Sequence, residues 1–479
     1  MSVNPTEPLY LFEFANREKP SINCDELEAF LNELWRKRGA HQLSPLHTSD
    51  QDRPSSSSQR FLHLLRDGSI QSRNYVGIIH YKGQAVHLLP KVFYEEDKAY
   101  TSQETQAIQA HVLWWLSYSD KLRFPKSFSG FNTLRSNFFE VLIYLFAAYT
   151  RQALAHKMYQ TYQEIDREQA YMKGRLNMAA YVSQNLSTGR WHRVACTYDS
   201  FEADNLLNRI IKYVARLLLA NTRNLDNKRL LQEIIFQLDE VTDTPITHAD
   251  CLRVSINPLF GEFATVLNYC KLFLANSTVL SYKNALQVYA FLLPTEYLFE
   301  HFVYGFLAKH LHGAFSTIEH QKSDAYLATL FEDEVRQQAV FQLKHDIYLE
   351  REQRKMIVDC KYKLVYPHET DEGAYDPKYG VSQADLYQLS AYAIRRGVRE
   401  LYLLYPSTIH APYPPTAHQK KVCFQVQDLF SPGPAIEIHL RQIPVTQPLD
   451  HIDLTKSMEA NFTHLEAQLR QCLAGIGKA

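Results

Sequence analysis

The chain has 479 residues, of which 46% are hydrophobic and 22% charged, a composition typical of a soluble protein with a sizeable core and about three domains. Its formal net charge of −1 excludes a global basic field, so any binding of nucleic acid must depend on local charge or on a partner. We find no apolar run that would span a bilayer and no signal-peptide pattern at the N-terminus. Seven scattered cysteines without a C-x-x-C pair favour reduced thiols in a cytoplasmic protein.

Residues 1–102 are predicted to form a small α+β unit. Pro8–Phe14 alternates like a strand, and Asp25–Arg38 carries apolar residues at helical spacing. Tyr75–Tyr81 and Gln84–Phe93 are separated by a Lys-Gly pair, which predicts a β-hairpin.

Residues 103–290 show mostly helical periodicity. Phe138–Ala155 is strongly apolar but is interrupted by Glu140, which favours a buried structural helix over a membrane helix. Leu206–Ala220 predicts a second amphipathic helix, and a polar stretch punctuated by glycines lies between the two at 174–189.

The pattern changes after Pro294 to alternating helices and strands. The predicted elements are, in chain order, a helix over Thr295–His312, strands over Phe341–Leu349 and Met356–Tyr362, a helix from the capping Ser382 to Arg396, strands over Glu400–Tyr405 and Ile436–Ile443, and a helix over Leu454–Leu473. We therefore predict an α/β domain over residues 291–446 and a helical tail over 447–479. The fold class of the whole chain is α/β and α+β, multidomain.

Three D-x-K triplets begin at Asp226, Asp359 and Asp376. The first lies in a polar connection between helices, and the third contains Pro377, which argues for a turn. Only the second follows a run of strand formers. Because residues i and i+2 of a strand face the same way, Asp359 and Lys361 are expected to project together.

The preceding strand carries Asp346 on its polar face, so a tight hairpin would bring this side chain near Asp359. Two carboxylates at close range repel each other unless a cation lies between them, and Mg²⁺ prefers oxygen ligands. A lysine beside them stabilises a charged phosphate transition state. The alternative is a pair of solvated surface aspartates, because charged residues are common on exposed strand faces. The register of the hairpin also stays open, since a slip of one residue turns Asp346 away.

Two helices supply candidate neighbours for this hairpin. Glu300 lies at the edge of an apolar helical stripe, from which it would reach a site between helix and sheet. Gln388 and Tyr392 lie on one side of the later helix with Asp385, where Gln388 would hold a water or a phosphate. The alternatives are a solvated boundary glutamate and an ordinary surface amide.

This order of a helix with Glu, a strand with Asp, a strand with D-x-K and a helix with Q-x-x-x-Y resembles the PD-(D/E)XK nuclease superfamily, especially its RecB-like branch. In particular it resembles the McrC family, the nuclease subunit of modification-dependent restriction systems. Further matches to that family are Tyr75–Ile79 with Leu88–Lys91, Lys173–Leu176, Tyr198–Asn205 with Asn208–Ile210, and Leu298–Glu300. Two departures are His345, where many members carry proline, and Cys360, where a small apolar residue is usual.

The resemblance implies roles for single residues. Glu300, Asp346 and Asp359 would ligate Mg²⁺, with Mn²⁺ as the alternative ion. Lys361 would orient the attacking water or stabilise the developing charge, and Gln388 and Tyr392 would support the catalytic site. Candidate DNA contacts are Lys344, Lys363, Arg395, Arg396 and Arg399, for which solvated charge is the alternative explanation.

The resemblance also implies a partner. McrC-like proteins act with McrB-like AAA+ GTPases that recognise modified DNA, and this chain has no G-x-x-x-x-G-K-[ST] motif of its own. Residues 103–290 would then serve as a mainly helical adaptor that docks on the partner. Arg175, Arg190 and Arg193 are candidates for stimulating its GTPase, and surface charge is the alternative.

The sequence thus predicts a Mg²⁺-dependent DNA endonuclease of a GTP-driven, modification-dependent restriction complex. Two other functions stay open. One is an assembly adaptor that activates the partner's GTPase and has a weak or silent nuclease fold. The other is a stand-alone repair nuclease of the RecB-like type.

Overall fold

The computed structural model describes residues 7–40, 58–119, 122, 138–279, 289–332, 335–364, 378–409, 422–427 and 434–477. The described chain forms two compact units. Unit 1 contains the described residues up to Val141 and from Asn276 onward, and unit 2 contains Leu142–Ala275. Among the described helices, none has both the length and the apolar character of a transmembrane span.

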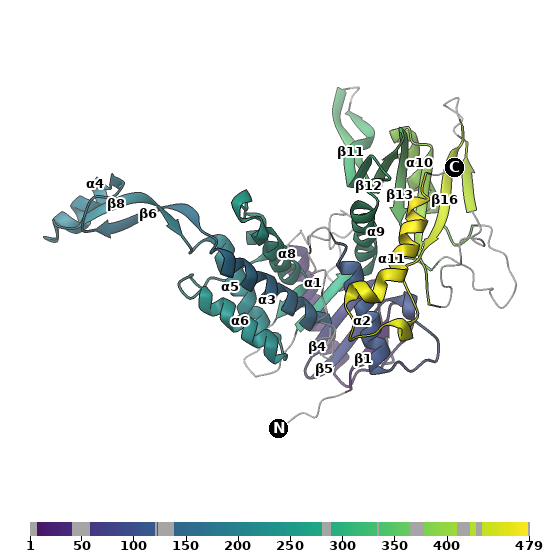
Figure 1. Ribbon diagram of the computed structural model, residues 1–479, viewed down its shortest axis with the longest axis horizontal. Helices are drawn as coiled ribbons and strands as arrows, with labels where there is room; N and C mark the ends of the chain where they lie inside the picture. Colours follow the sequence, from purple (N-terminus) through teal and green to yellow (C-terminus); the bar gives the residue numbers. More distant parts are fainter. Residues whose placement is uncertain are drawn as a thin grey trace. The chain divides into compact units, whose positions relative to one another are not determined.

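Unit 1 begins with a five-stranded sheet (Figure 1). Its strands in spatial order are β1 (Leu9–Phe12), β5 (Gln84–Leu89), β4 (Tyr75–Tyr81), β10 (Tyr289–Pro294) and β9 (Ser277–Val279). Helix α1 (Cys24–Ala40) packs its apolar residues against this sheet. The predicted hairpin is confirmed as β4 and β5, and its turn has positive φ at Lys82 and Gly83. Pairing of β10 with β4 joins segments that lie about 200 residues apart in the sequence.

The sheet of unit 1 that carries the predicted site has six strands. In spatial order they are β11 (Thr317–Glu332), β12 (Val335–Arg351), β13 (Arg354–Cys360), β14 (Glu400–Pro406), β16 (Ile436–Ile443) and β15 (Val422–Val426). Strands β13, β14 and β16 run parallel, and the other pairs are antiparallel. Helix α10 (Gln383–Arg396) packs its apolar side on one face of the sheet. The predicted α/β character is confirmed, whereas β11 was not predicted, because much of this strand is exposed and lacks a regular apolar face.

Three helices of unit 1 share an aromatic core. They are α2 (Ser102–Leu116), α9 (Thr295–His310) and α11 (Met458–Ala474). Trp114 of α2 stacks on Phe462 of α11 with ring centroids 4.7 Å apart, and it also contacts Phe302 of α9 at 4.8 Å. The indole of Trp115 donates to the carbonyl of Val445 at 3.1 Å. Short 3₁₀ segments complete the unit at η2 (Lys91–Phe93) and η6 (Leu449–His451), and a small hairpin is formed by β2 (Leu62–Leu64) and β3 (Ile70–Ser72).

Unit 2 combines helices with a three-stranded sheet. The helices are α3 (Phe138–His156), which begins in unit 1, α5 (Leu206–Asn221), α6 (Leu225–Gln237), α7 (His248–Leu252) and α8 (Glu262–Asn276), with a 3₁₀ turn η5 (Pro258–Phe260). The sheet has the order β6 (Thr161–Gln169), β8 (Val194–Glu202), β7 (Arg175–Leu176), and α4 (Met178–Ala180) with the π-helical turn η4 (Tyr181–Leu186) lies between β7 and β8 in the chain. Of these helices the sequence predicted α3 and α5, and it missed the three strands. The placement of Asp226 in a polar connection between helices was wrong, because Asn224 caps α6 and Asp226 lies in the first turn of that helix. Strand β6 has no buried residue, so its hydrophobic alternation is weak.

Candidate active site

Strands β12 and β13 pair in a register that brings the two predicted aspartates together. Ile347 lies opposite Val358, and the same register continued by one step sets Asp346 opposite Asp359. The backbone N–H of Cys360 donates to Asp346 Oδ2 at 2.8 Å. The side chain of Asp346 therefore reaches across to β13 beside Asp359.

Asp359 and Lys361 form an ion pair at the end of β13. Lys361 Nζ lies 2.9 Å from Asp359 Oδ2, and the Asp359 side chain is almost fully buried. The backbone of Lys361 donates to the carbonyl of Leu404 at 2.9 Å, which fixes this residue beside β14. Burial lowers the pKa of Lys361, but Asp359 and Asp346 outweigh it and raise the pKa above its ordinary value. The side chain is therefore an ammonium group.

The positive charge near Asp346 and Asp359 does not offset the burial and the mutual repulsion of the carboxylates. Burial, followed by the charges of Glu300 and Asp359, raises the pKa of Asp346 well above its ordinary value. Burial also raises the pKa of Asp359, against the opposing effect of Lys361. A divalent cation would relieve both effects, since it stabilises the charged form of each carboxylate. These two side chains fit Mg²⁺, whose preferred ligands are oxygens.

Glu300 of α9 is buried and already oriented by strand β11. His320 Nε2 contacts its Oε1 at 2.9 Å, and Gln321 Nε2 donates to the same oxygen at 3.0 Å. Burial raises the pKa of Glu300, but the bond from His320 and the nearby histidines lower it overall. The ring of His320 stacks on Tyr304 at 4.4 Å. Sequence reasoning missed His320 and Gln321, because β11 was not predicted and carries no motif.

The three predicted metal ligands do not converge tightly in this conformation. Within the described residues, ligand atoms of three His, Cys, Asp or Glu side chains lie within 4.8 Å of one another at Cys423, Glu437 and His439, and Glu300, Asp346 and Asp359 do not form a second such group. The structure therefore brings Asp346 close to Asp359, while Glu300 is held by its bonds to β11. Its role as a third ligand stays a prediction.

Helix α10 contributes a carboxylate that the sequence did not assign to the site. Lys363 Nζ pairs with Asp385 Oδ2 at 2.7 Å, and Lys361 Nζ lies 3.9 Å from Asp385 Oδ1. Ser382 accepts a bond from the Asp385 N–H, as predicted for the helix cap. The predicted DNA contact Lys363 is thus partly neutralised by an acidic neighbour. The capping pattern was visible in the sequence, but the pairing depends on the tertiary fold.

Gln388 and Tyr392 connect α10 to β12. Gln388 Nε2 donates to the Tyr392 hydroxyl at 2.7 Å, and that hydroxyl donates to the carbonyl of Lys344 at 2.8 Å. Gln388 itself is exposed. This chain of bonds positions the strand that carries Asp346.

His345 is buried behind the site, where the resemblance would place a proline. Its ring contacts Tyr392 at 4.6 Å, and Arg396 Nε donates to its Nε2 at 2.8 Å. Burial and the charge of Arg396 lower the pKa of His345 to about 4, so the imidazole is neutral and accepts this bond. Arg396 also forms an ion pair with Asp324.

The other candidate DNA contacts lie at the surface or at its edge. Arg395 is exposed, and its Nε donates to the carbonyl of Tyr326 at 2.6 Å. Lys344 and Arg399 are partly buried. These positions leave their role in DNA binding a prediction.

The three arginines predicted to act on a partner all lie in unit 2. Arg175 pairs with Glu164 at 3.4 Å, while Arg190 and Arg193 share Glu168 at 3.7 and 3.4 Å. All three side chains are more than half exposed. Exposed ion pairs are weak, so the guanidinium groups remain available to an outside ligand.

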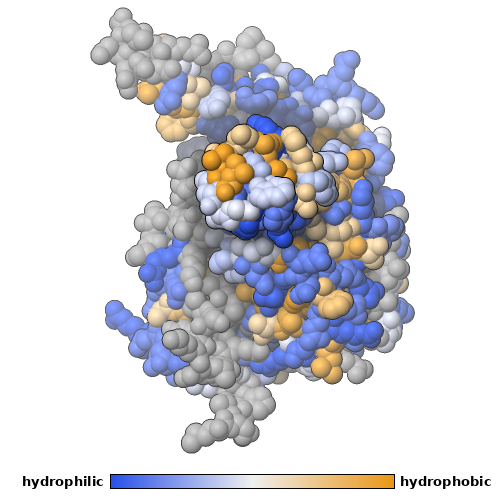
Figure 2. Space-filling view, turned by 90° about the vertical axis from the view of Figure 1, so that its left-hand side faces the viewer, coloured by the Kyte–Doolittle hydropathy of each residue, from blue (hydrophilic) through white to orange (hydrophobic). Residues whose placement is uncertain are grey.

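Exposed apolar side chains accompany these arginines. They are Tyr162, Tyr171, Met172, Met178, Val182, Leu186, Trp191 and Phe201. Figure 2 looks at this end of unit 2 and shows hydrophobic surface, in orange, beside hydrophilic surface. We call these residues the β6–β8 surface. Large exposed apolar patches are common at the interaction sites of proteins.

The chain is similar to one family of known proteins. The model of a family described as McrBC 5-methylcytosine restriction system component matches residues 70–406. A search of curated proteins gave no match.

Two solved structures from Thermococcus gammatolerans are similar. One is a refined half-complex from a tetradecameric assembly of McrB AAA+ hexamers with bound McrC, with 19% identity, a TM-score of 0.63, and coverage of 98% of this chain and 100% of that chain. The other is a cryo-EM structure of the McrBC complex, with 20% identity, a TM-score of 0.46, and coverage of 64% and 88%. The first similarity shows a shared fold over nearly the whole chain.

Proposed function

Because the chain belongs to the family of McrBC 5-methylcytosine restriction system components, we propose that it is the Mg²⁺-dependent DNA endonuclease subunit of such a system. The family match confirms the resemblance drawn from the sequence. The proposal extends to a GTP-driven AAA+ partner that selects methylated or otherwise modified DNA and delivers it. The observation that carries the nuclease assignment is the Asp359–Lys361 pair with Asp346 on the neighbouring strand.

The chemistry would be hydrolysis of a phosphodiester bond by water. A bound Mg²⁺ supplies Lewis-acid activation of the water and neutralises charge on the phosphate. Asp346 and Asp359 would hold the ion through their carboxylate oxygens. Because Lys361 is an ammonium group, it stabilises negative charge on the phosphate oxygens and does not remove a proton from water. The water oxygen would bond to phosphorus as the P–O bond to the leaving sugar oxygen breaks. The proton of the water would pass to solvent, and the leaving oxygen would take a proton from solvent.

The nuclease assignment is tested by DNA cleavage with the partner, GTP and Mg²⁺. We expect Asp359→Asn and Lys361→Ala to reduce cleavage by about 100-fold or more, the scale of losing one charge-stabilising group. The matched control is Asp226→Asn, which alters the D-x-K triplet at the exposed start of α6. Cleavage by Asp359→Asn at the wild-type rate would remove the assignment.

A second candidate function is supported by the β6–β8 surface. Its exposed aromatic and apolar residues, together with Arg175, Arg190 and Arg193, are of the residue types that are enriched at protein–protein interfaces. The similar fold of a McrC bound to McrB hexamers is consistent with a docking role. On this view the chain acts as an assembly adaptor that stimulates the partner's GTPase, whether or not its nuclease is active.

The two functions separate in a single set of assays. Asp359→Asn should abolish cleavage and leave partner GTPase stimulation intact, if the chain has both. Wild-type protein that stimulates GTPase but never cuts modified DNA would favour the adaptor alone. Cleavage of DNA by the wild-type chain without any partner or GTP would instead favour a stand-alone repair nuclease.

A further inference from the structure

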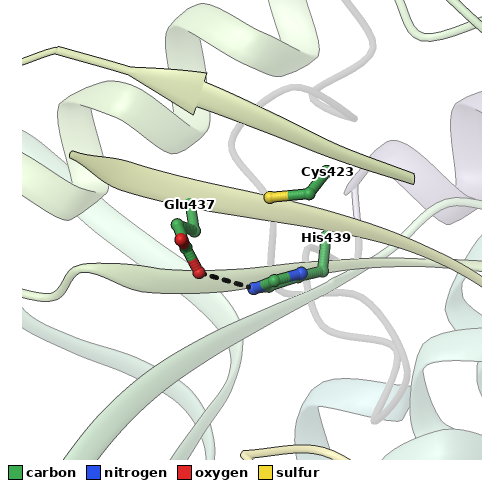
Figure 3. Close-up of side chains that lie close together, drawn as sticks. All are labelled: Cys423, Glu437 and His439. Carbon is green, nitrogen blue, oxygen red and sulfur yellow. Dashed lines mark ion pairs between the residues drawn. The ribbon is translucent and has the colours of Figure 1, made fainter. Parts of the chain in front are cut away.

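Three side chains with metal-binding atoms lie together on β15 and β16, at the edge of the six-stranded sheet (Figure 3). Cys423 of β15 pairs directly with His439 of β16, and Glu437 lies two residues before His439. All three therefore project from the same face of the sheet. The cysteine sulfur, a carboxylate oxygen and an imidazole nitrogen lie within 4.8 Å of one another.

This cluster is separate from the proposed nuclease site. In the register of the sheet, His439 lies beside Tyr402, which lies beside Val358. Asp359 follows Val358 directly and so projects from the opposite face. The two groups of side chains cannot share one ion.

The imidazole of His439 is held in place by the ring beneath it. It stacks on Tyr402 with centroids 5.0 Å apart and an interplanar angle of 24°. The Tyr402 hydroxyl donates to Glu400 and accepts from the Gly477 N–H at 3.0 Å, which fixes that ring. This stack fixes the plane of the imidazole beside the side chains of Cys423 and Glu437.

The polar atoms of these three side chains face one another, and the described residues offer them few hydrogen bonds. His439 Nε2 lies 3.3 Å from Glu437 Oε2, and within the described residues this buried nitrogen makes no hydrogen bond. Glu437 Oε1 accepts from Gln425 Nε2 at 3.4 Å, which leaves Oε2 turned toward the imidazole. The exposed thiol of Cys423 donates to the Phe424 carbonyl over a long distance of 3.7 Å.

A bound cation would balance the charges of the cluster. Once deprotonated, the thiolate and the carboxylate carry two negative charges, and the neutral imidazole adds a third donor. A divalent ion would balance them, and the displaced thiol proton passes to solvent.

We propose that Cys423, Glu437 and His439 bind a thiophilic divalent cation of the Zn²⁺ class. Sulfur, nitrogen and oxygen donors are the set that Zn²⁺ takes in proteins, whereas Mg²⁺ takes oxygen. Three protein ligands leave a fourth position for water or another donor. Among the strands that the structure describes, β15 lies at one edge of the sheet beside β16, so the ion would join this strand to its neighbour.

The proposal is tested on the full chain with Co²⁺ as the probe, since a thiolate bound to cobalt gives a charge-transfer band that carboxylates do not give. We expect one equivalent of Co²⁺ to produce this band and Zn²⁺ to displace it. Cys423→Ser should abolish the band, and His439→Gln should weaken Co²⁺ binding by about tenfold or more. Hydrogen exchange of β15 amides should slow when Zn²⁺ is added to the wild-type chain.

Two controls make the outcome decisive. Cys24→Ser removes a partly buried thiol at the start of helix α1 and should keep the band, and Asp359→Asn should keep it as well. Absence of the band in the wild-type chain, or its persistence in a Cys423→Ser variant with an unchanged circular dichroism spectrum, would overturn the metal site. Neither result bears on DNA cleavage, so the nuclease proposal stands or falls separately.

Discussion

At the scale of single residues, the acidic side chains of the β12–β13 hairpin are crowded and shielded from water. Burial, Glu300 and Asp359 together raise the pKa of Asp346. A carboxyl whose pKa is raised on folding contributes most stability when it is protonated, below its unfolded pKa, and loses that contribution as the pH rises through its folded pKa. Repulsion between these carboxylates therefore lowers the stability of the site, and a bound cation would relieve it.

The same argument predicts that a variant without the Asp346 carboxylate is more stable than wild type and does not cleave DNA. Without metal, Asp346→Asn should raise the free energy of unfolding above wild type at about pH 8, and the gain should shrink toward about pH 5. The amide oxygen still accepts from the Cys360 N–H. Denaturant titrations at both pH values measure the difference. Added Mg²⁺ should stabilise wild type and leave the variant unchanged, and a variant less stable than wild type at every pH would contradict the repulsion argument.

Glu13 shows the same effect away from the hairpin. Burial raises its pKa to about 7, although the Lys91 charge and bonds from Thr295 and the Lys91 N–H oppose this. Since the unfolded pKa is near 4.5, wild type should lose stability as the pH rises from about 4.5 through about 7, by an upper limit of about 3 kcal/mol. Glu13→Gln should flatten that loss. Unfolding free energies measured across this pH range give the slope, and equal slopes in both proteins would refute the assignment.

At the scale of secondary structure, the sequence predicted elements with a strong apolar signal and missed those without one. The run of strand formers before Asp359 predicted β13, in which Met356–Cys360 are all buried. The capping Ser382, followed by apolar residues at helical spacing, predicted α10. Strand β6 has no buried residue, and much of β11 is exposed, so neither has a strong periodic signal. The bonds from β11 to Glu300 were consequently invisible in the sequence.

The turn of the β12–β13 hairpin is locally strained. Glu352 and Gln353 have φ of 49° and 68°, a left-handed conformation that favours glycine or asparagine. Gln353→Gly should therefore raise the free energy of unfolding by about 1 kcal/mol. The control Lys355→Gly, at an exposed position within β13, should lower it, since glycine weakens a strand. Thermal unfolding of the two variants measures both effects, and a lower melting temperature for Gln353→Gly would contradict the strain.

At the scale of the whole molecule, unit 1 joins segments from both ends of the chain. Trp114 and Trp115 of α2 pack with Phe302, Phe462 and the backbone of Val445, so a helix from the first quarter of the sequence completes the core beside the six-stranded sheet. No local sequence pattern predicts contacts between segments that lie so far apart in the chain. A truncation that removes residues 1–290 would delete Trp114 and Trp115 and expose Phe302 and Phe462, and the loss of one such aromatic group costs about 3–5 kcal/mol. Functions of the two units are better separated by point substitutions.

The β6–β8 surface of unit 2 offers such a substitution. Trp191 is 71% exposed, and its carbonyl accepts from the Tyr181 hydroxyl at 2.9 Å, a bond that survives a change of side chain. Trp191→Ala should therefore leave folding intact. If this surface docks on the GTPase partner, stimulation of GTP hydrolysis should fall by about tenfold or more, because a buried tryptophan at an interface contributes about 2 kcal/mol or more.

The matched control for Trp191→Ala is Phe236→Ala, which removes an aromatic side chain that is 80% exposed on α6. The control should stimulate the partner as wild type does. Partner GTPase rates measured against the concentration of each variant distinguish weaker docking, which shifts the curve, from lost stimulation, which lowers its plateau. An equal loss of GTPase stimulation in both variants would mean that the effect is not specific to Trp191. The proposal that the β6–β8 surface is the docking site would then be wrong.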